Sequence, residues 1–141
     1  MAKKWKKRGE ICSFCGRNPG FSTQSPYCRV CSHFSARMKN ERLSPEVQEA
    51  LRRYVRRHYY VCAYSQLELN VFDYADPCFL EFDHVVPGNP KKVVICCAWI
   101  NEMKGDMTVS EFHRSVKQLF NLWFKGIKMK KPEFRYWYRL L

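Results

Sequence analysis

The chain has 141 residues and carries 25 lysines and arginines against 13 acidic residues, a formal net charge of +12. This length accommodates one domain, or a small domain with an appended module, and the charge favours a polyanionic partner: most often nucleic acid, less often an anionic membrane surface. No apolar run approaches the ~20 residues needed to cross a bilayer, so we expect no membrane-spanning segment.

The N-terminus, Met1 to Glu10, is a basic arm rather than a signal peptide. Five of its residues are lysine or arginine, and no apolar stretch follows them. We therefore expect an intracellular protein. In that reducing setting, the eight cysteines are expected to be metal ligands or core residues rather than disulfides.

Two CxxC pairs follow the arm, with twelve residues between them. Cys12 and Cys15 form the first pair, and Cys28 and Cys31 form the second. Tight turns at each pair can aim four thiolates at one point, which predicts a structural zinc ion with no open position for chemistry. Two disulfides are the alternative, which the missing secretion signal disfavours. Residues 1–43 are thus predicted to be a basic arm and a zinc module.

A basic connecting helix is predicted over residues 44–60. Ser44 suits the N-cap, Pro45 the first helical position and Glu46 the first turn, and apolar residues then recur at helical spacing. Four arginines lie largely off the apolar stripe and either contact a DNA backbone or form an ordinary solvated face: Arg52, Arg53, Arg56 and Arg57.

The predicted core module, residues 61–124, is acidic where the rest of the chain is basic. Between Val61 and Phe112 there are eight acidic residues against three lysines, a net charge of −5, which leaves +17 for the remainder. A cation-binding centre flanked by polyanion-binding arms would have this distribution. Ordinary solvated acids on the surface are the alternative reading.

Two strands are predicted in this module, Cys78 to Val86 and Val93 to Cys97, joined by a turn that contains Gly-Asn-Pro. The pair Asp83-His84 lies at the end of the first strand. Asn101 lies where a helix is expected to begin after the second. A carboxylate, an imidazole and an amide held on a hairpin and a helix can build a single-metal phosphodiesterase site. The alternative is a strand-end pair and a helix-capping asparagine.

Three short motifs occur in order in this region: CAYS at 62–65, EFDHVVP at 81–87 and NEMKGD at 101–106. With them, the region from Val61 to Phe112 resembles the HNH (ββα-metal) nucleases, both phage and homing enzymes and the HNH domain of RNA-guided CRISPR nucleases. The resemblance implies an α+β fold in which a small zinc-ribbon or knuckle module precedes a ββα-metal hairpin–helix core with flanking helices.

The resemblance also implies roles for individual residues. His84 matches the general base that takes a proton from the attacking water, and Asp83 and Asn101 match the ligands of a catalytic Mg²⁺ or Mn²⁺. Lys104 matches a recurrent lysine near the phosphate. Hydrolysis of DNA by such a site would give 5′-phosphate and 3′-hydroxyl ends.

The chain departs from the family pattern in two places. The family's middle asparagine, which orients the histidine, aligns here with Lys92, and Asn89 is the nearest possible substitute. Many relatives hold another zinc on CxxC pairs that flank the module, whereas here only Cys62 and Cys97 remain. We therefore expect no second zinc, with Cys62 and Cys97 as small buried apolar residues.

The C-terminal part predicts an amphipathic helix from Val109 to Ile127 whose wide apolar face is mostly core. The tail, residues 125–141, interleaves aromatic residues with cations. Lys128, Lys130 and Lys131 suit phosphate contact, with the rings stacking on bases. Alternatively, the aromatic residues dock back onto the domain or form a dimer contact.

The leading interpretation is a metal-dependent DNA endonuclease. A non-catalytic, zinc-dependent DNA-binding or regulatory protein on a degenerate HNH scaffold is the main alternative. A third reading has the aromatic tail joining the chain to a larger assembly. A single site per chain cuts one strand, so double-strand cutting would require a homodimer.

Overall fold

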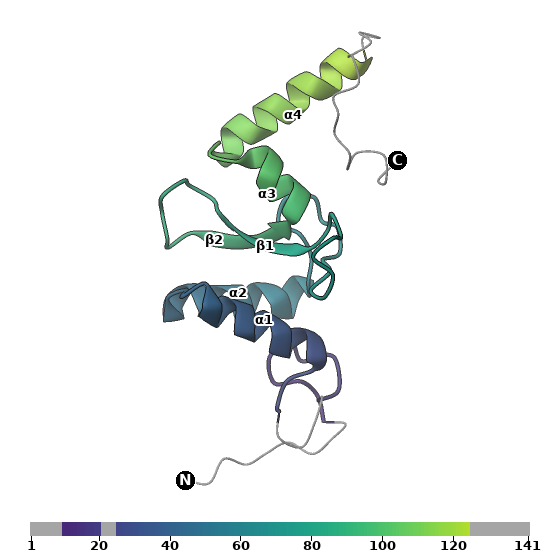
Figure 1. Ribbon diagram of the computed structural model, residues 1–141, viewed down its shortest axis with the longest axis vertical. Coiled ribbons are helices and arrows are strands. Elements are labelled where there is room, and N and C mark those ends of the chain that lie inside the picture. The colour runs from purple at the N-terminus through teal and green to yellow at the C-terminus, as the bar shows by residue number, and fades with distance from the viewer. Residues whose placement is uncertain (1–9, 21–24, 125–141) are drawn as a thin grey trace.

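The structure is a computed structural model that describes residues 10–20 and 25–124. These residues form helices α1 (Arg29–Asn40), α2 (Pro45–His58), α3 (Ala98–Lys104) and α4 (Val109–Phe124), and strands β1 (Leu80–His84) and β2 (Val93–Cys97). The predicted α+β class is therefore confirmed. In Figure 1 the β1–β2 hairpin lies between the pair α1–α2 on one side and α3 on the other.

Helix α1 was not predicted as a helix. It begins directly after Cys28, whose sulfur caps the helix by accepting a hydrogen bond from the backbone N–H of Cys31. Cys31, Phe34, Ser35 and Met38 are its buried residues, at the 3–4 spacing of an amphipathic helix. The second CxxC pair is thus the N-cap and first turns of a helix rather than an isolated knuckle.

Helix α2 begins where the sequence predicts. Ser44 is the N-cap, its hydroxyl accepting from the backbone N–H of Val47 at 3.4 Å, and a proline occupies the first turn. Val47, Leu51 and Val55 bury the predicted stripe. The helix ends at His58, and its C-cap Tyr59 adopts a positive φ of 57° while the Tyr59 N–H still bonds the carbonyl of Val55 at 2.7 Å.

The hairpin is antiparallel, with Asp83 opposite Val94 and His84 opposite Val93. The predicted bounds of β2 are confirmed, while β1 is shorter than the predicted strand. Beyond it, the N–H of Val85 bonds the carbonyl of Lys92 at 2.9 Å, and Gly88 takes a φ of +75° in the loop. Helix α3 begins immediately after β2 and contacts both strands, so the order β–β–α is continuous.

A single buried cluster runs from the cysteines of the N-terminal module to the hairpin and to Phe112. Phe34 of α1 links the two parts. Its ring centroid lies 5.4 Å from that of Tyr60 and 5.7 Å from that of Phe82 on β1. Because the N-terminal module and the hairpin share this core, a change in one is expected to affect the stability of the other.

Helix α4 projects away from the rest of the fold (Figure 1). Phe112 is buried near its start, but four large apolar side chains farther along are exposed: Val116, Leu119, Phe120 and Leu122. The prediction that the apolar face is mostly core is therefore wrong for these residues. Helical periodicity shows that a face is apolar, but not that another element covers it. Within the described residues, no helix has the length and apolarity to cross a membrane.

Candidate metal centre and hairpin–helix site

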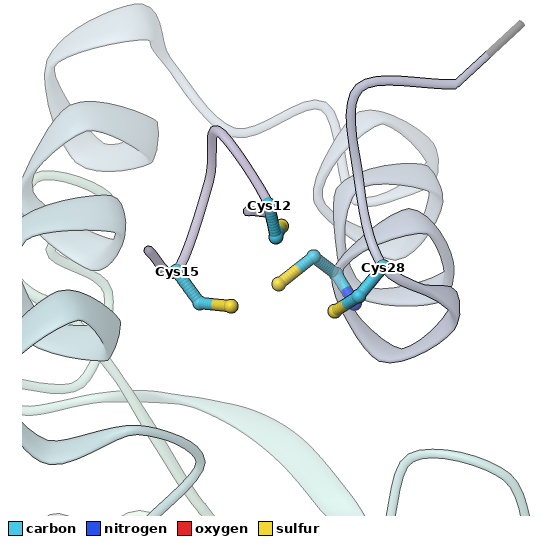
Figure 2. A group of neighbouring side chains, drawn as sticks. Cys12, Cys15 and Cys28 are labelled. Atoms are coloured by element: carbon cyan, nitrogen blue, oxygen red, sulfur yellow. The ribbon is translucent and has the colours of Figure 1, made fainter. Parts of the chain in front are cut away.

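The four N-terminal cysteines converge. All their sulfur atoms lie within 4.8 Å of one another and all four residues are buried. Figure 2 shows Cys12 and Cys15 on one loop, facing Cys28 at the start of the helix. All eight cysteines of the chain are free thiols, so the structure contains no disulfide. Four buried sulfurs in this arrangement could hold a structural metal such as zinc.

Backbone geometry explains how the first pair is presented. The N–H of Gly16 bonds the carbonyl of Cys12 at 2.8 Å, and Gly16 has a φ of +71°, a region that glycine occupies without strain. Burial opposes ionisation of Cys12, but backbone N–H groups of Cys15, Cys28 and Phe14 outweigh it and lower its pKa to about 7. Burial instead raises the pKa of Cys31.

A buried tyrosine connects this centre to the rest of the fold. The hydroxyl of Tyr60 donates to the sulfur of Cys31 at 2.9 Å, while the backbone carbonyl of Tyr60 accepts from the N–H of Leu69 at 2.7 Å. Tyr60 is 1% exposed. A hydrogen bond to a ligand sulfur from outside the four ligands is typical of metal sites that are built to hold one geometry.

The arginines of α2 are divided between internal contacts and the surface. Arg56 donates to the carbonyls of Phe14 at 3.0 Å and Ser13 at 3.3 Å, the turn that carries the first cysteine pair. Arg17 donates back to the carbonyl of Arg57 at 3.1 Å. Arg56 therefore fixes the cysteine turn to α2. Sequence reasoning missed this role because Arg56 is far from Ser13 and Phe14 in the chain.

The other α2 arginines lie differently. Arg52 is placed over the ring of Phe14 at 5.5 Å, and Arg53 lies 3.7 Å from the carboxylate of Glu49. Arg53, Arg56 and Arg57 are all exposed, and Arg56 differs from the other two in its hydrogen bonds to the cysteine turn. DNA contact by the four arginines stays a prediction, and Lys128, Lys130 and Lys131 lie outside the described residues.

The hairpin–helix residues differ sharply in exposure. Asp83 is 5% exposed and Lys104 is 1% exposed, whereas His84 is exposed at the end of β1. Asn101 is half-buried on α3, where its backbone carbonyl accepts from the N–H of Gly105 at 3.0 Å. The side chain of Asn101 makes no hydrogen bond within the described ranges.

Asp83 is held from two sides. The Lys104 ammonium group donates to Oδ1 of Asp83 at 3.1 Å and to the backbone carbonyl of His84 at 3.2 Å. The hydroxyl of Tyr64 donates to Oδ2 of Asp83. Burial, followed by the hydrogen bond to Asp83, raises the pKa of Tyr64, so the hydroxyl keeps its proton. Sequence reasoning placed Tyr64 in a motif but gave it no role.

His84 has a less constrained environment. The nearest candidate to orient it, Asn89, uses its side-chain oxygen to accept from the backbone N–H of Lys91 at 3.0 Å within the hairpin loop. Lys92 is exposed. No hydrogen bond reaches the His84 imidazole from the parts of the chain that the structure describes. The ring is therefore accessible but is not fixed by a neighbour.

Two further buried thiols, Cys62 and Cys97, lie at the end of the hairpin where Cys97 pairs with Leu80. The sulfur of Cys62 accepts from the backbone N–H groups of Ser65 and Cys97, each at 3.4 Å, and the Ser65 hydroxyl lies 3.7 Å from the Cys97 sulfur. Cys62 and Cys97 are buried, as predicted. The hydrogen bond from the Cys97 thiol, helped by those from Ser65, lowers the pKa of Cys62 to about 5. The sulfur of Cys62 thus accepts hydrogen bonds, which the prediction of a small apolar residue did not include.

The donor set of the hairpin–helix site suits a hard divalent cation. Asp83 offers carboxylate oxygens and Asn101 an amide oxygen, the ligands that Mg²⁺ prefers. Each oxygen of Asp83 already accepts one hydrogen bond, Oδ1 from Lys104 and Oδ2 from Tyr64. Comparisons with protein-family models, with curated proteins and with solved structures found no match to this chain.

Proposed function

We propose that this chain is a metal-dependent DNA endonuclease. The observation that carries the proposal is the placement of Asp83 and His84 at the end of β1 with Asn101 on the helix that follows β2. A carboxylate, an exposed imidazole and an amide on a β–β–α unit are the parts of a one-metal HNH site, the family that the sequence motifs resemble. The net charge of +12 supports a polyanionic substrate.

In this proposal each residue has a separate task. His84 takes a proton from a water molecule, and its exposure lets both water and a phosphate reach the ring. Asp83 and Asn101 would hold Mg²⁺ or Mn²⁺, which when bound supplies Lewis-acid stabilisation of charge on the phosphate and the leaving oxygen. The water oxygen forms a bond to phosphorus while the bond to the 3′ oxygen breaks, and the 3′ oxygen takes up a proton from solvent, which leaves 5′-phosphate and 3′-hydroxyl ends.

The four-cysteine centre has a structural role in the same proposal. Zn²⁺ bound by Cys12, Cys15, Cys28 and Cys31 would have a closed coordination sphere and could not bind substrate. It would stabilise α1 and, through the shared core around Phe34, the hairpin that carries Asp83 and His84.

A supercoiled plasmid assay tests the proposal. Wild-type protein with Mg²⁺ or Mn²⁺ is expected to nick or linearise the plasmid, and His84→Ala to lose this activity. His33→Ala is the matched control, because His33 is an exposed histidine on α1 whose ring contacts Phe72 rather than a residue of the hairpin. Absence of cutting with every divalent metal tested, or equal cutting by His84→Ala, would contradict the proposal that the protein is an endonuclease.

The unconstrained environment of His84 favours a second candidate. A general base usually needs an orienting partner, and here the side chain of Asn89 accepts a hydrogen bond within its own loop instead of bonding His84. A zinc-dependent DNA-binding or regulatory protein would bind DNA in the same assay without cutting it. Binding that falls steeply with salt, with no cleavage product, would support this candidate.

A further inference from the structure

Asp83 and Lys104 are the two buried charged residues of the described chain. Lysine and aspartate are seldom buried unless they are paired. Here Nζ of Lys104 lies 3.1 Å from Oδ1 of Asp83, in a part of the fold from which water is nearly excluded. The pair is therefore a built feature of the fold and differs from the exposed ion pairs of α2.

The ammonium group of Lys104 bonds both residues of the Asp83-His84 pair. It reaches the side chain of Asp83 and the backbone carbonyl of His84, while Tyr64 takes the other carboxylate oxygen. Tyr64 is itself anchored by an edge contact with Phe112, their ring centroids 6.2 Å apart. Asp83 thus keeps one orientation, with its negative charge already balanced by a cation from the same chain.

A divalent ion at Asp83 would meet this cation. Two like charges within a few ångströms in a poorly solvated site repel strongly. We infer that Lys104 is the resident cation of the Asp83 site: it occupies the carboxylate in the metal-free protein, and a divalent metal loads only by displacing its ammonium group from Oδ1. The inference rests on the proposed function, because it concerns the metal of that site.

Two consequences follow. Lys104 lowers the affinity of the site for a divalent metal, and its release accompanies metal binding. Tyr64 holds Oδ2 in both states and so keeps Asp83 in place while the cation changes. In this role Lys104 acts on Asp83, whereas the family resemblance gives it a position beside the phosphate.

Direct Mn²⁺ binding tests the inference without DNA. Free Mn²⁺ is measured by electron paramagnetic resonance in titrations of wild type, Lys104→Met and the charge-retaining control Lys104→Arg, with Asp83→Asn as the blank. We expect Lys104→Met to bind Mn²⁺ roughly tenfold more tightly or better, Lys104→Arg to stay close to wild type, and Asp83→Asn to lose the site.

Two results overturn the inference, and they differ in what they say of the proposed function. Mn²⁺ binding to wild type that Lys104→Met does not tighten overturns the inference and leaves the metal site standing. Absence of Asp83-dependent Mn²⁺ binding in both proteins overturns the inference and the metal-dependent enzyme together.

A second measurement uses the wild-type protein, in case Lys104→Met does not fold. In protein with ¹⁵N-labelled lysine, the buried ammonium group of Lys104 is followed by ¹H–¹⁵N correlation, and Lys104→Arg assigns its signal. Saturating Mg²⁺ is expected to shift or abolish that signal as the group leaves Asp83. A Lys104 signal that stays unchanged while the hairpin backbone signals move with Mg²⁺ contradicts displacement.

Discussion

The hydroxyl group of Tyr60 donates a hydrogen bond to the sulfur of Cys31 across 2.9 Å, in a site where both residues are almost completely buried. Tyr60 also pairs through its backbone with Leu69, on the segment that leads to β1. Together with Phe34, which packs against both Tyr60 and Phe82 of β1, Tyr60 connects the four-cysteine centre to the hairpin. We therefore expect metal binding at the four cysteines to stabilise the hairpin that carries Asp83 and His84.

If the four cysteines hold the proposed zinc ion, its removal should destabilise more than the N-terminal module. A strong chelator is expected to lower the melting temperature of the whole protein in a single transition, because the cysteines and the hairpin share one core. Colorimetric zinc release should give one zinc per chain for wild type and none for Cys15→Ser. Two separate melting transitions, with only the first sensitive to chelator, would show that the two parts are independent.

Arg56 and Arg53, both on α2, provide a test variant and its matched control. Arg56→Ala removes hydrogen bonds to the carbonyls of Ser13 and Phe14 and should cost about 1–2 kcal/mol of unfolding free energy. Arg53→Ala should change stability by less than ~0.5 kcal/mol, since its side chain makes a surface ion pair with Glu49 and no hydrogen bond to the cysteine turn. Urea unfolding measures both.

The same two variants separate a structural from a DNA-binding role. If the α2 face contacts phosphates, Arg53→Ala weakens DNA binding and flattens its dependence on salt. Anisotropy titrations of a labelled duplex at several salt concentrations measure this. In the urea experiment, equal stability of Arg56→Ala and Arg53→Ala would contradict a structural role for the hydrogen bonds of Arg56.

The buried pair Asp83–Lys104 should be strongly coupled in stability. Loss of the ammonium group in Lys104→Met leaves a buried carboxylate without its counter-charge, which typically costs about 3–5 kcal/mol. The double variant Asp83→Asn, Lys104→Met should lose less than the sum of the single variants, because neither charge remains. Additive losses in a double-mutant cycle would mean that the two residues act independently.

Cys62 should make stability depend on pH. Its pKa is about 5 in the fold against an ordinary value of 9.0, so the folded state binds fewer protons than the unfolded state between these values. The stabilisation is present in full above about pH 9 and is lost as the pH falls toward 5.

Comparison with Cys62→Ser isolates this effect from acid release of a metal bound by the four N-terminal cysteines. The difference in unfolding free energy between wild type and Cys62→Ser, from urea titrations, should grow as the pH rises from 5 to 9. The thiol of Cys97 does not interfere in this window, because its hydrogen bond with Cys62 and its burial raise its pKa. A difference that is constant with pH would contradict a Cys62 thiolate.

Local signals accounted for much of the fold. The cap at Ser44 with Pro45 predicted the start of α2, and the β-branched run from Val93 predicted β2. Helix α1 was missed because its N-cap is a cysteine, which was interpreted only as a ligand. The burial of Cys31, Phe34 and Met38 follows a helical period that could have revealed it.

The rest could not be predicted because it depends on contacts between distant residues. Tyr64 and Lys104 meet Asp83 from 19 and 21 positions away, and no spacing rule relates them. The four-cysteine cluster was predictable, since a repeated CxxC spacing is itself a geometric constraint. The exposure of Leu119 and Phe120 on α4 required knowing what packs beside that helix.

Single-turnover cleavage of an end-labelled DNA duplex tests the central proposal most directly. With Mg²⁺ or Mn²⁺ in excess, wild type should produce fragments that a DNA ligase rejoins without prior phosphorylation, which identifies 5′-phosphate and 3′-hydroxyl ends. His84→Ala should cut at least ~100-fold more slowly, as expected for loss of a general base, while His33→Ala keeps the wild-type rate. An intact duplex under every divalent metal, or equal cleavage by His84→Ala, would contradict the endonuclease.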